Sequence, residues 1–191
     1  MRLPDAVGNL YQSEDRKDRA YGKAGQLIRS KGAEYRYDSD GNLIEKANIN
    51  GDKWQYEWNA AGMLKRVIRP DKNVVAFKYD ALGRRISKSY LGTTTRWVWD
   101  GNVPLHEWEI PAEDFITPVN QSLSRESIYL EQQKDTVITW IFEPDSFSPM
   151  GRIQGDKQYS LVTDYLGTPN MVLDTAGNKI CLLYTSPSPR D

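Results

Sequence analysis

Tyr37-Asp38-Ser39-Asp40-Gly41-Asn42-Leu43 follows a pattern that recurs along the chain: an aromatic residue, Asp or Asn, two further residues, Gly, one residue and an aliphatic residue. The pattern returns at 58–64 and at 79–86, where it is one residue longer, and a looser copy lies at 21–27. Successive aromatic residues lie 16, 21 and 21 residues apart, and a further 20 residues lead to Trp99-Asp100-Gly101. A unit of this period cannot bury its own apolar face and must stack on its neighbours. The repeat therefore predicts a structural scaffold.

Each unit has the sequence features of a β-hairpin. Trp54, Tyr56 and Trp58 alternate with polar residues, which is typical of a half-buried strand. The Asx-x-x-Gly segment then reverses the chain, because an Asx side chain accepts hydrogen bonds from nearby backbone N–H groups and Gly readily adopts a positive φ. Turn residues at 50–52 and 70–73 reverse it again before the next aromatic strand. Each unit is therefore expected to form two strands and two turns.

The repeat positions that we expect to carry the fold are the aromatic residue, the Asx residue and the glycine. These positions are Tyr37, Asp38, Gly41, Trp58, Asn59, Gly62, Tyr79, Asp80, Gly83, Trp99 and Asp100. Aromatic side chains on a sheet can stack on sugars or nucleic-acid bases, or they can form cross-strand pairs and the core. Because Tyr or Trp recurs beside the turn in each of these units, packing explains them without a ligand. We therefore assign these positions a structural role.

Composition excludes several classes of function. The chain has 191 residues, enough for one domain with a core, and it contains 6 Trp and 11 Tyr. Its mean hydropathy of −0.67 suits a sheet with one wet face. The net charge is −1 with no sustained basic stripe, so nucleic-acid binding has no electrostatic support. No apolar run is long enough for a membrane span, and no apolar segment near Met1 resembles a signal peptide.

No group of residues in the sequence forms a convincing catalytic or metal site. His106 is the single histidine, and no Gly-x-Ser-x-Gly motif supplies a nucleophile for it. The Asp38-Ser39-Asp40-Gly41 segment begins like a calcium loop, but its Gly is the fourth residue instead of the sixth, and Ile49 stands where the loop needs Glu. We therefore predict no catalytic residue, no cofactor and no metal.

The regular repeats occupy residues 21–109. They follow a degenerate repeat and a charged linker at 1–20, and a loop or insertion at 110–135 interrupts them. Within 136–180, strand-like patterns resume at 136–142, 158–163 and 170–173. Residues 181–191 read CLLYTSPSPRD, which resembles the translation of a sequencing-library adapter. On that interpretation the natural protein continues past Ile180, and the single cysteine, Cys181, says nothing about redox compartment.

Several stretches resemble the Rhs (rearrangement hot spot) family of YD-repeat proteins. They are Arg69-Pro70-Asp71, Phe77-Lys78-Tyr79-Asp80-Ala81-Leu82-Gly83-Arg84-Arg85-Ile86, the Trp-rich block at 95–108, Trp140-Ile141-Phe142-Glu143-Pro144 and Thr163-Asp164-Tyr165-Leu166-Gly167-Thr168-Pro169. The resemblance covers nearly all of residues 5–180. The repeat alone also occurs in animal teneurins and insecticidal toxin complexes. The Trp-rich block and the Asp-Tyr-Leu-Gly-Thr-Pro block are more specific to bacterial Rhs proteins.

The resemblance implies an all-β fold in which YD-repeat hairpins stack in a spiralling sheet, as part of a large hollow β-shell. In the family the shell encloses a C-terminal toxin domain used in interbacterial competition. A Pro-x-x-x-x-Asp-Pro-x-Gly-Leu motif closes the shell; this sequence does not contain it, so no cleavage residues can be carried over. The implied partners are the protein's own toxin domain and a secretion apparatus with its adaptors, which would deliver the protein. The alternative is a cell-surface YD-repeat protein that binds carbohydrate or cell wall.

Overall fold

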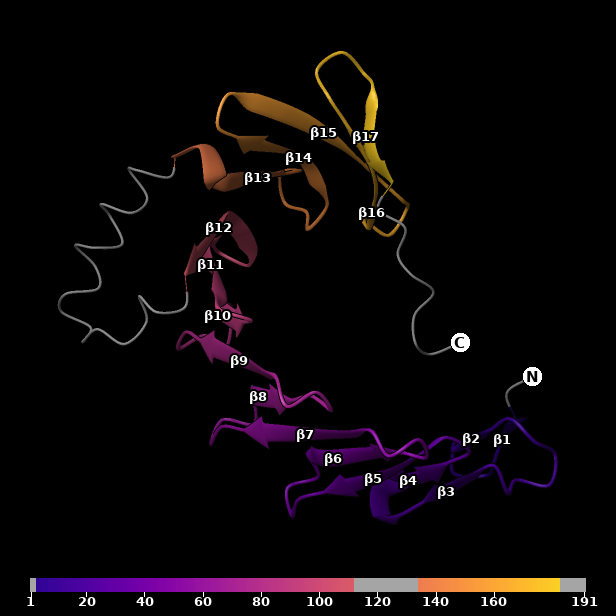
Figure 1. Cartoon of the computed structure of the whole chain (residues 1–191). Helices are drawn as coiled ribbons and strands as arrows, with labels where there is room; N and C mark the ends of the chain where they lie inside the picture. The colour runs from indigo at the N-terminus through magenta and orange to yellow at the C-terminus, as the bar shows by residue number, and fades with distance from the viewer. Residues whose placement is uncertain (1–2, 112–133, 183–191) are drawn as a thin grey trace. The chain divides into compact units, whose positions relative to one another are not determined.

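The computed structural model describes residues 3–111 and 134–182, and strands make up nearly all of its regular structure (Figure 1). The chain divides into two compact units, Met1–Lys78 and Tyr79–Asp191. In each unit the strands of the main sheet follow one another in chain order, and every registered pair is antiparallel. This confirms the prediction of an all-β fold built from stacked hairpins.

The first unit contains a two-stranded sheet and a larger one. The small sheet pairs β1 (Leu3–Pro4) with β2 (Leu10–Tyr11). The strands of the larger sheet are β3 (Arg19–Tyr21), β4 (Leu27–Ser30), β5 (Ala33–Tyr37), β6 (Leu43–Asn48), β7 (Lys53–Trp58), β8 (Leu64–Ile68) and β9 (Val74–Tyr79), which ends at the unit boundary. A short 3-10 helix, η1 (Lys23–Gly25), lies between β3 and β4.

The second unit continues the same architecture. Its strands are β10 (Arg85–Tyr90), β11 (Thr93–Asp100), β12 (Val103–Pro111), β13 (Ile138–Phe142), β14 (Pro149–Gln154), β15 (Lys157–Thr163), β16 (Pro169–Leu173) and β17 (Lys179–Leu182). The 3-10 helix η3 (Lys134–Thr136) precedes β13. No helix among the described residues is long and apolar enough to cross a membrane.

The sheet of the first unit has one aromatic face and one charged face. Tyr56 pairs in register with the buried Val67 on the aromatic face, which also carries Trp54. On the other face Glu45 lies between two cations, 3.8 Å from Arg36 and 3.3 Å from Lys53. Alternation with period two thus gathers the aromatic side chains on one face, as the sequence predicts, although Lys46 also lies on that face, between Tyr35 and Trp54.

The core is thin, because most aromatic side chains remain partly exposed. The buried apolar residues are Ala33, Val67, Trp108, Ile110, Leu161 and Val172. Tyr37, Trp58 and Trp99 are only half-buried. Within a sheet each strand has one neighbouring strand on each side, so the strands rely on contacts between adjacent hairpins.

A β-bulge recurs on the strand that returns from the turn. Tyr37 pairs with Leu43 and Arg36 pairs with Glu45, so Ile44 is left without a partner in the register. The same shift leaves out one residue in six further strand pairs, namely Ile28, Lys65, Leu105, Met150, Asn170 and Ile180. The β10–β11 and β14–β15 pairs run without a shift. A bulge bends its strand and increases the local twist. The repeat therefore adds a bend at the same place in successive hairpins.

The predicted loop at 110–135 lies mostly outside the described residues, which omit 112–133. Its described ends are ordered: β12 runs through Pro111, and η3 occupies Lys134–Thr136. Of the predicted adapter tail, residues 183–191 also lie outside the described part, whereas Cys181 and Leu182 end β17. Strand β14 was not predicted from the sequence.

Candidate functional site: repeat turns and bonds between hairpins

The Asx side chain of the repeat closes the turn that it begins. Oδ1 of Asp38 accepts hydrogen bonds from the backbone N–H groups of Asp40 at 3.0 Å and Asn42 at 2.8 Å. The backbone closes the same loop, because Asp38 N–H donates to the Asn42 carbonyl and Gly41 N–H donates to the Asp38 carbonyl. Gly41 has a φ of 87°, which an L-residue rarely adopts. This geometry is a three-residue hairpin loop with glycine in the left-handed position.

The other repeats build the same turn. Asn59 Oδ1 accepts from the N–H groups of Ala61 and Met63, both at 3.0 Å. Asp80 Oδ1 accepts from Leu82 and Arg84 at 2.9 Å, and its Oδ2 accepts from Arg84 Nε at 2.7 Å. Turns at Asp5, Asp164 and Asp174 repeat the pattern. The glycines of all these turns have positive φ: Gly8, Gly41, Gly62, Gly83, Gly167 and Gly177.

The hydrogen bonds of the turn stabilise the charged form of its aspartates. The backbone N–H of Asn42, aided by its side chain, holds the pKa of Asp38 below the ordinary value. The side chain and backbone of Asn178 likewise lower the pKa of Asp174. These carboxylates therefore act as turn-closing acceptors and are poor candidates for proton transfer at neutral pH.

The aromatic residue of one repeat donates a hydrogen bond to the backbone of the repeat before it. The Tyr37 hydroxyl donates to the Leu27 carbonyl at 3.0 Å, and Trp58 Nε1 donates to the Leu43 carbonyl at 2.8 Å. In the second unit Trp99 Nε1 donates to the Arg85 carbonyl at 3.0 Å. We call this bond the inter-hairpin latch.

The acceptor of the latch occupies a constant position. The accepting carbonyl belongs to the fifth residue after the one that begins the preceding turn. Leu43, for example, is the fifth residue after Asp38. A fourth latch joins the Tyr21 hydroxyl to the carbonyl of Leu10, which is five residues after Asp5. In the Tyr37 and Trp58 latches the acceptor directly precedes the bulged residue, at a point where a bulge disrupts the strand ladder. The aromatic donor therefore provides a hydrogen bond to a backbone carbonyl that lies beside a β-bulge.

Trp99 and Asp100 belong to a different turn. Both lie in β11, where Asp100 pairs with Val103 across a two-residue turn that contains Gly101. Asp100 thus does not close an Asx turn, although Trp99 makes the latch. Tyr79 ends β9, immediately before the Asp80 turn.

Sequence reasoning missed the latch, although the sequence carries a signal for it. The residue before the turn is Tyr or Trp in the regular repeats and is not Phe. Tyr and Trp are the large aromatic residues whose side chains end in a strong hydrogen-bond donor. Packing alone would accept Phe equally well.

Glu107 and the single histidine lie where β12 meets β13. Glu107 Oε2 accepts from Trp97 Nε1 at 3.1 Å and from Trp140 Nε1 at 3.4 Å. His106 Nδ1 lies 3.0 Å from Thr139 Oγ1. His106 and Glu107 thus have partners in the neighbouring strands, and these contacts hold β13 to β12 across the long connection between them.

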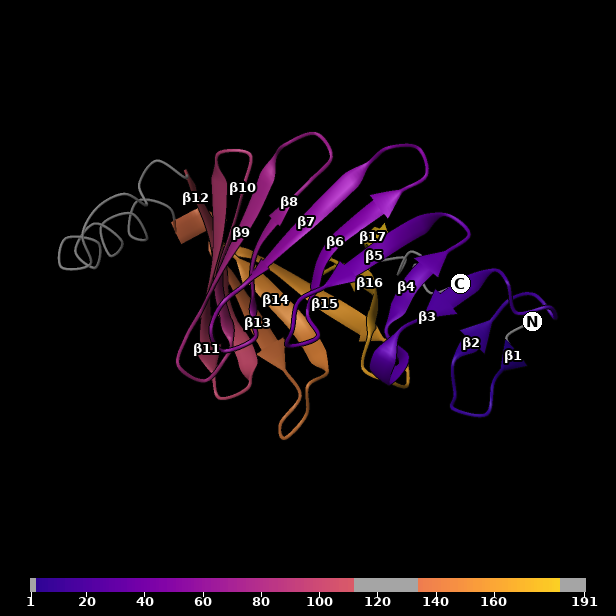
Figure 2. The same cartoon turned by 90° about the horizontal axis from the view of Figure 1, so that it is seen from below.

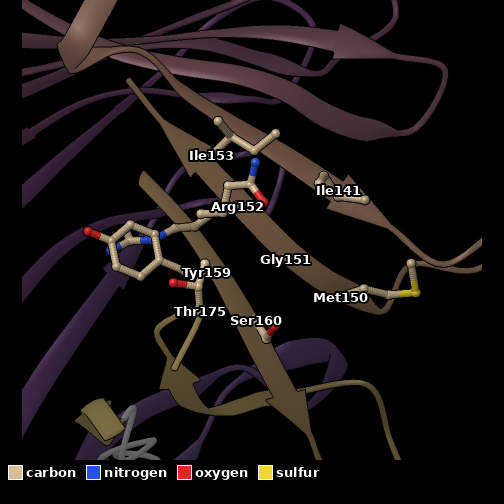
Figure 3. A pocket seen from close by; sticks show the side chains of 9 residues that line it. Ile141, Met150, Gly151, Arg152, Ile153, Tyr159, Ser160 and Thr175 are labelled. Atoms are coloured by element: carbon tan, nitrogen blue, oxygen red, sulfur yellow. The ribbon is translucent and has the colours of Figure 1, made fainter. Parts of the chain in front are cut away.

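A shallow groove of about 280 Å³ follows β14 in the second unit (Figure 3). It passes Gly151, where a Cβ would lie only 2.9 Å from the Tyr159 carbonyl oxygen. Arg152 stacks its guanidinium over the Tyr159 ring at 4.9 Å. The groove is smaller than typical ligand pockets of about 300–1,000 Å³, and its lining has no His, Cys, Asp or Glu. It does not assemble a catalytic set, and within residues 3–111 and 134–182 no cluster suited to a metal ion occurs.

Known proteins share both the sequence pattern and the fold. Residues 5–99 match the family model described as Teneurin YD-shell. The RhsB protein of Dickeya dadantii is 33% identical over 106 residues, which cover 52% of this chain and 7% of that protein. A double-stranded DNA deaminase toxin A of Burkholderia cenocepacia is 28% identical, over 91% of this chain and 13% of its own length.

Solved structures show the same fold at low sequence identity. The Photorhabdus luminescens Tc holotoxin pore and TcdB2-TccC3 without its hypervariable C-terminal region each have a TM-score of 0.50 at 13% identity. In each case the similarity covers 93% of this chain and 11% of the matched chain. The chain thus spans about a tenth of the length of its relatives, and its predicted resemblance to Rhs proteins is confirmed. The chain is a stretch of YD-repeat shell related to the Rhs proteins.

Proposed function

We propose that this chain is part of the wall of an Rhs-type toxin, in which a closed shell encloses a C-terminal toxin domain and helps to deliver it in interbacterial competition. The observation that carries the proposal is the inter-hairpin latch, which bonds a hairpin to the one before it. A wall must exclude other macromolecules along its whole length. The latch recurs at Tyr21, Tyr37, Trp58 and Trp99, and at each of these hairpins it holds the hairpin to the one before it.

Two further observations support a wall instead of an active site. Two relatives, from Burkholderia cenocepacia and Pseudomonas aeruginosa, are named as toxins, and this chain matches only 13% and 6% of their length. The family model that matches residues 5–99 describes a shell domain. The wall would therefore act sterically, and the chemistry of the toxin would reside elsewhere in the longer protein.

The latch removes one way in which a carbohydrate could bind, namely as acceptor of hydrogen bonds from the indole N–H groups. The indole N–H groups of Trp58 and Trp99 donate to backbone carbonyls within the sheet. These donors are therefore not available to sugar hydroxyls.

The experiment begins by extending the reading frame beyond Ile180 in genomic DNA and expressing the full-length protein. We expect a variable C-terminal domain that resists trypsin in the intact protein and is digested when expressed alone. Trp58→Ala, which removes the latch donor and its ring, should make that domain sensitive to trypsin in the intact protein. An equally sensitive C-terminal domain in the unaltered protein, or a frame that continues into cell-wall anchoring repeats, would refute the proposal.

A further inference from the structure

The strand ladder between β12 and β13 is short. Among the described residues, these strands are in register at His106–Thr139 and Glu107–Ile138. The ladders on either side are longer, because every residue of β11 pairs with β12 and every residue of β13 pairs with β14. Fewer backbone hydrogen bonds therefore join β12 to β13 than join either strand to its other neighbour.

The sequence of β12 and the start of β13 explain why this ladder ends so soon. Leu105, directly before His106, is the bulged residue of β12, and a bulge bends its strand and disrupts the ladder. Pro104 comes before it and has no N–H to donate. In the other direction, β13 begins at Ile138, so residues 108–111 of β12 extend past it. Because β12 and β13 are already neighbours in the sheet, no other strand can pair between them.

A long connection joins these two strands, whereas short turns join the strands of the hairpins. Residues 112–137 separate β12 from β13 in the sequence. The β4–β5 ladder is equally short, but a two-residue turn joins its strands and the Tyr37 latch bonds β5 to Leu27 in β4. Parting β4 from β5 therefore requires a turn and a latch to break, whereas β12 and β13 can part while each stays in its own longer ladder.

Side chains replace the missing ladder bonds at this junction. Glu107 Oε2 lies 3.1 Å from Trp97 Nε1 of β11 and 3.4 Å from Trp140 Nε1 of β13. One carboxylate oxygen of β12 thus accepts hydrogen bonds from indoles on both neighbouring strands. Hydrogen bonds to a charged acceptor are stronger than those between neutral groups. We refer to Glu107, Trp97 and Trp140 as the clasp. His106 Nδ1, 3.0 Å from Thr139 Oγ1, makes a second side-chain contact across the junction.

We propose that the sheet of the second unit opens first between β12 and β13, and that the clasp keeps this junction closed. Opening there would leave two antiparallel blocks intact, β10–β12 and β13–β17, the second coloured orange to yellow in Figure 2. In the proposed wall, this junction is where a gap would form first. That consequence rests on the proposed function, whereas the opening itself is a property of the sheet and is measured on the amides of its strands.

The test is hydrogen–deuterium exchange of the full-length protein, resolved to single amides. Under conditions in which exchange reports the opening equilibrium, amides that bond across β12–β13 should exchange about tenfold faster or more than those that bond across β11–β12 or β13–β14. Glu107→Ala removes the shared acceptor and should accelerate exchange across the junction about tenfold further. Glu109→Ala is the matched control and should leave exchange unchanged, because Glu109 is exposed on the same face of β12 and pairs with Thr95 in β11.

A disulfide across the junction tests the opening without relying on the Glu107 variant. His106→Cys with Thr139→Cys changes two directly opposite positions, whose Cα atoms in an antiparallel pair lie about 4.5–5.5 Å apart, which suits a disulfide. Its oxidation should slow exchange across the junction about tenfold, whereas the control pair Thr95→Cys with Glu109→Cys, across β11–β12, should not. Equal exchange at all three junctions in the unaltered protein, no effect of Glu107→Ala, or equal slowing by both disulfides would overturn the proposal.

Discussion

Replacing Tyr37 with Phe tests whether the inter-hairpin latch stabilises the wall. The substitution removes one oxygen atom and keeps the ring, so the hydrogen bond to the Leu27 carbonyl at 3.0 Å is lost while the packing stays. This latch joins β5 to the start of β4, and its acceptor lies directly before the bulged Ile28. We therefore expect the loss to appear first in β4 and β5.

The expected magnitude follows from the environment of the bond. A hydrogen bond in a protein contributes about 0.5–1.5 kcal/mol net, and the side chain of Tyr37 is half-buried, so about 1 kcal/mol is expected. That corresponds to an increase of about fivefold in the equilibrium constant for local opening. Because hairpins pair only with their neighbours in the sheet, the effect should fade within a hairpin or two.

Hydrogen–deuterium exchange of the full-length protein measures this effect. Under conditions in which exchange reports the opening equilibrium, amides of β4 and β5 should exchange about fivefold faster in Tyr37→Phe. Tyr35→Phe is the matched control: Tyr35 lies on the same face of β5, and its hydroxyl forms no hydrogen bond within the described residues. Equal exchange in wild type and both variants would show that the latch contributes no stability. Equal acceleration in both variants would attribute the effect to the loss of any hydroxyl from this face.

Three other changes should have distinct effects. Gly62→Ala should lower the free energy of unfolding by about 1–2 kcal/mol, because its φ of +72° is unfavourable for Ala; no atom lies near the new Cβ, so no clash adds to this cost. Gly32→Ala is the control: the site is equally open but has no positive φ, so the denaturant midpoint should stay nearly unchanged. Gly151→Ala should cost about 1–3 kcal/mol and accelerate amide exchange in β14 and β15, because its Cβ would lie 2.9 Å from the Tyr159 carbonyl; protection equal to wild type would refute the clash. Acid should weaken the Asp38 turn, because the pKa of Asp38 in the folded protein lies below its ordinary value of 3.8. The ionised carboxylate therefore contributes its full stabilisation above pH 3.8, and this stabilisation is lost as the pH falls through the lowered pKa. An Asp38→Asn variant should lose less stability over that range, as measured by thermal midpoints.

The sequence predicts the hairpins because their signals are local. Alternation in β7 and the Asx-x-x-Gly segment after it determine where the chain extends and where it reverses. The same physics explains the Arg69–Asn73 turn, which has the same backbone hydrogen bonds but places Lys72 at a φ of 67° where the repeats have Gly. A turn residue without a Cβ is preferred there, but it is not required.

Features that depend on a neighbouring strand were not predictable in the same way. Strand β14 begins with Pro149 and contains Gly151, both of which weaken a strand prediction. The structure shows why Gly151 belongs there, because the backbone of β15 passes too close for a Cβ. The inter-hairpin latch likewise joins residues about ten to fifteen positions apart and involves a backbone acceptor, which has no signature of its own in the sequence. Only the choice of Tyr or Trp over Phe could have indicated it.

The constant position of the latch explains how the repeat tolerates units of different length. The unit from Tyr21 to Tyr37 is 16 residues long, and the next, from Tyr37 to Trp58, is 21. The difference lies at the end of the strands away from the latch: β4 has 4 residues and is followed by a two-residue turn before β5, whereas β6 has 6 residues and is followed by the longer Asn48–Asp52 turn. The acceptor is still the fifth residue after the start of the preceding turn in both cases. The latched end therefore keeps neighbouring hairpins in register, and the opposite end is free to vary in strand length and turn type.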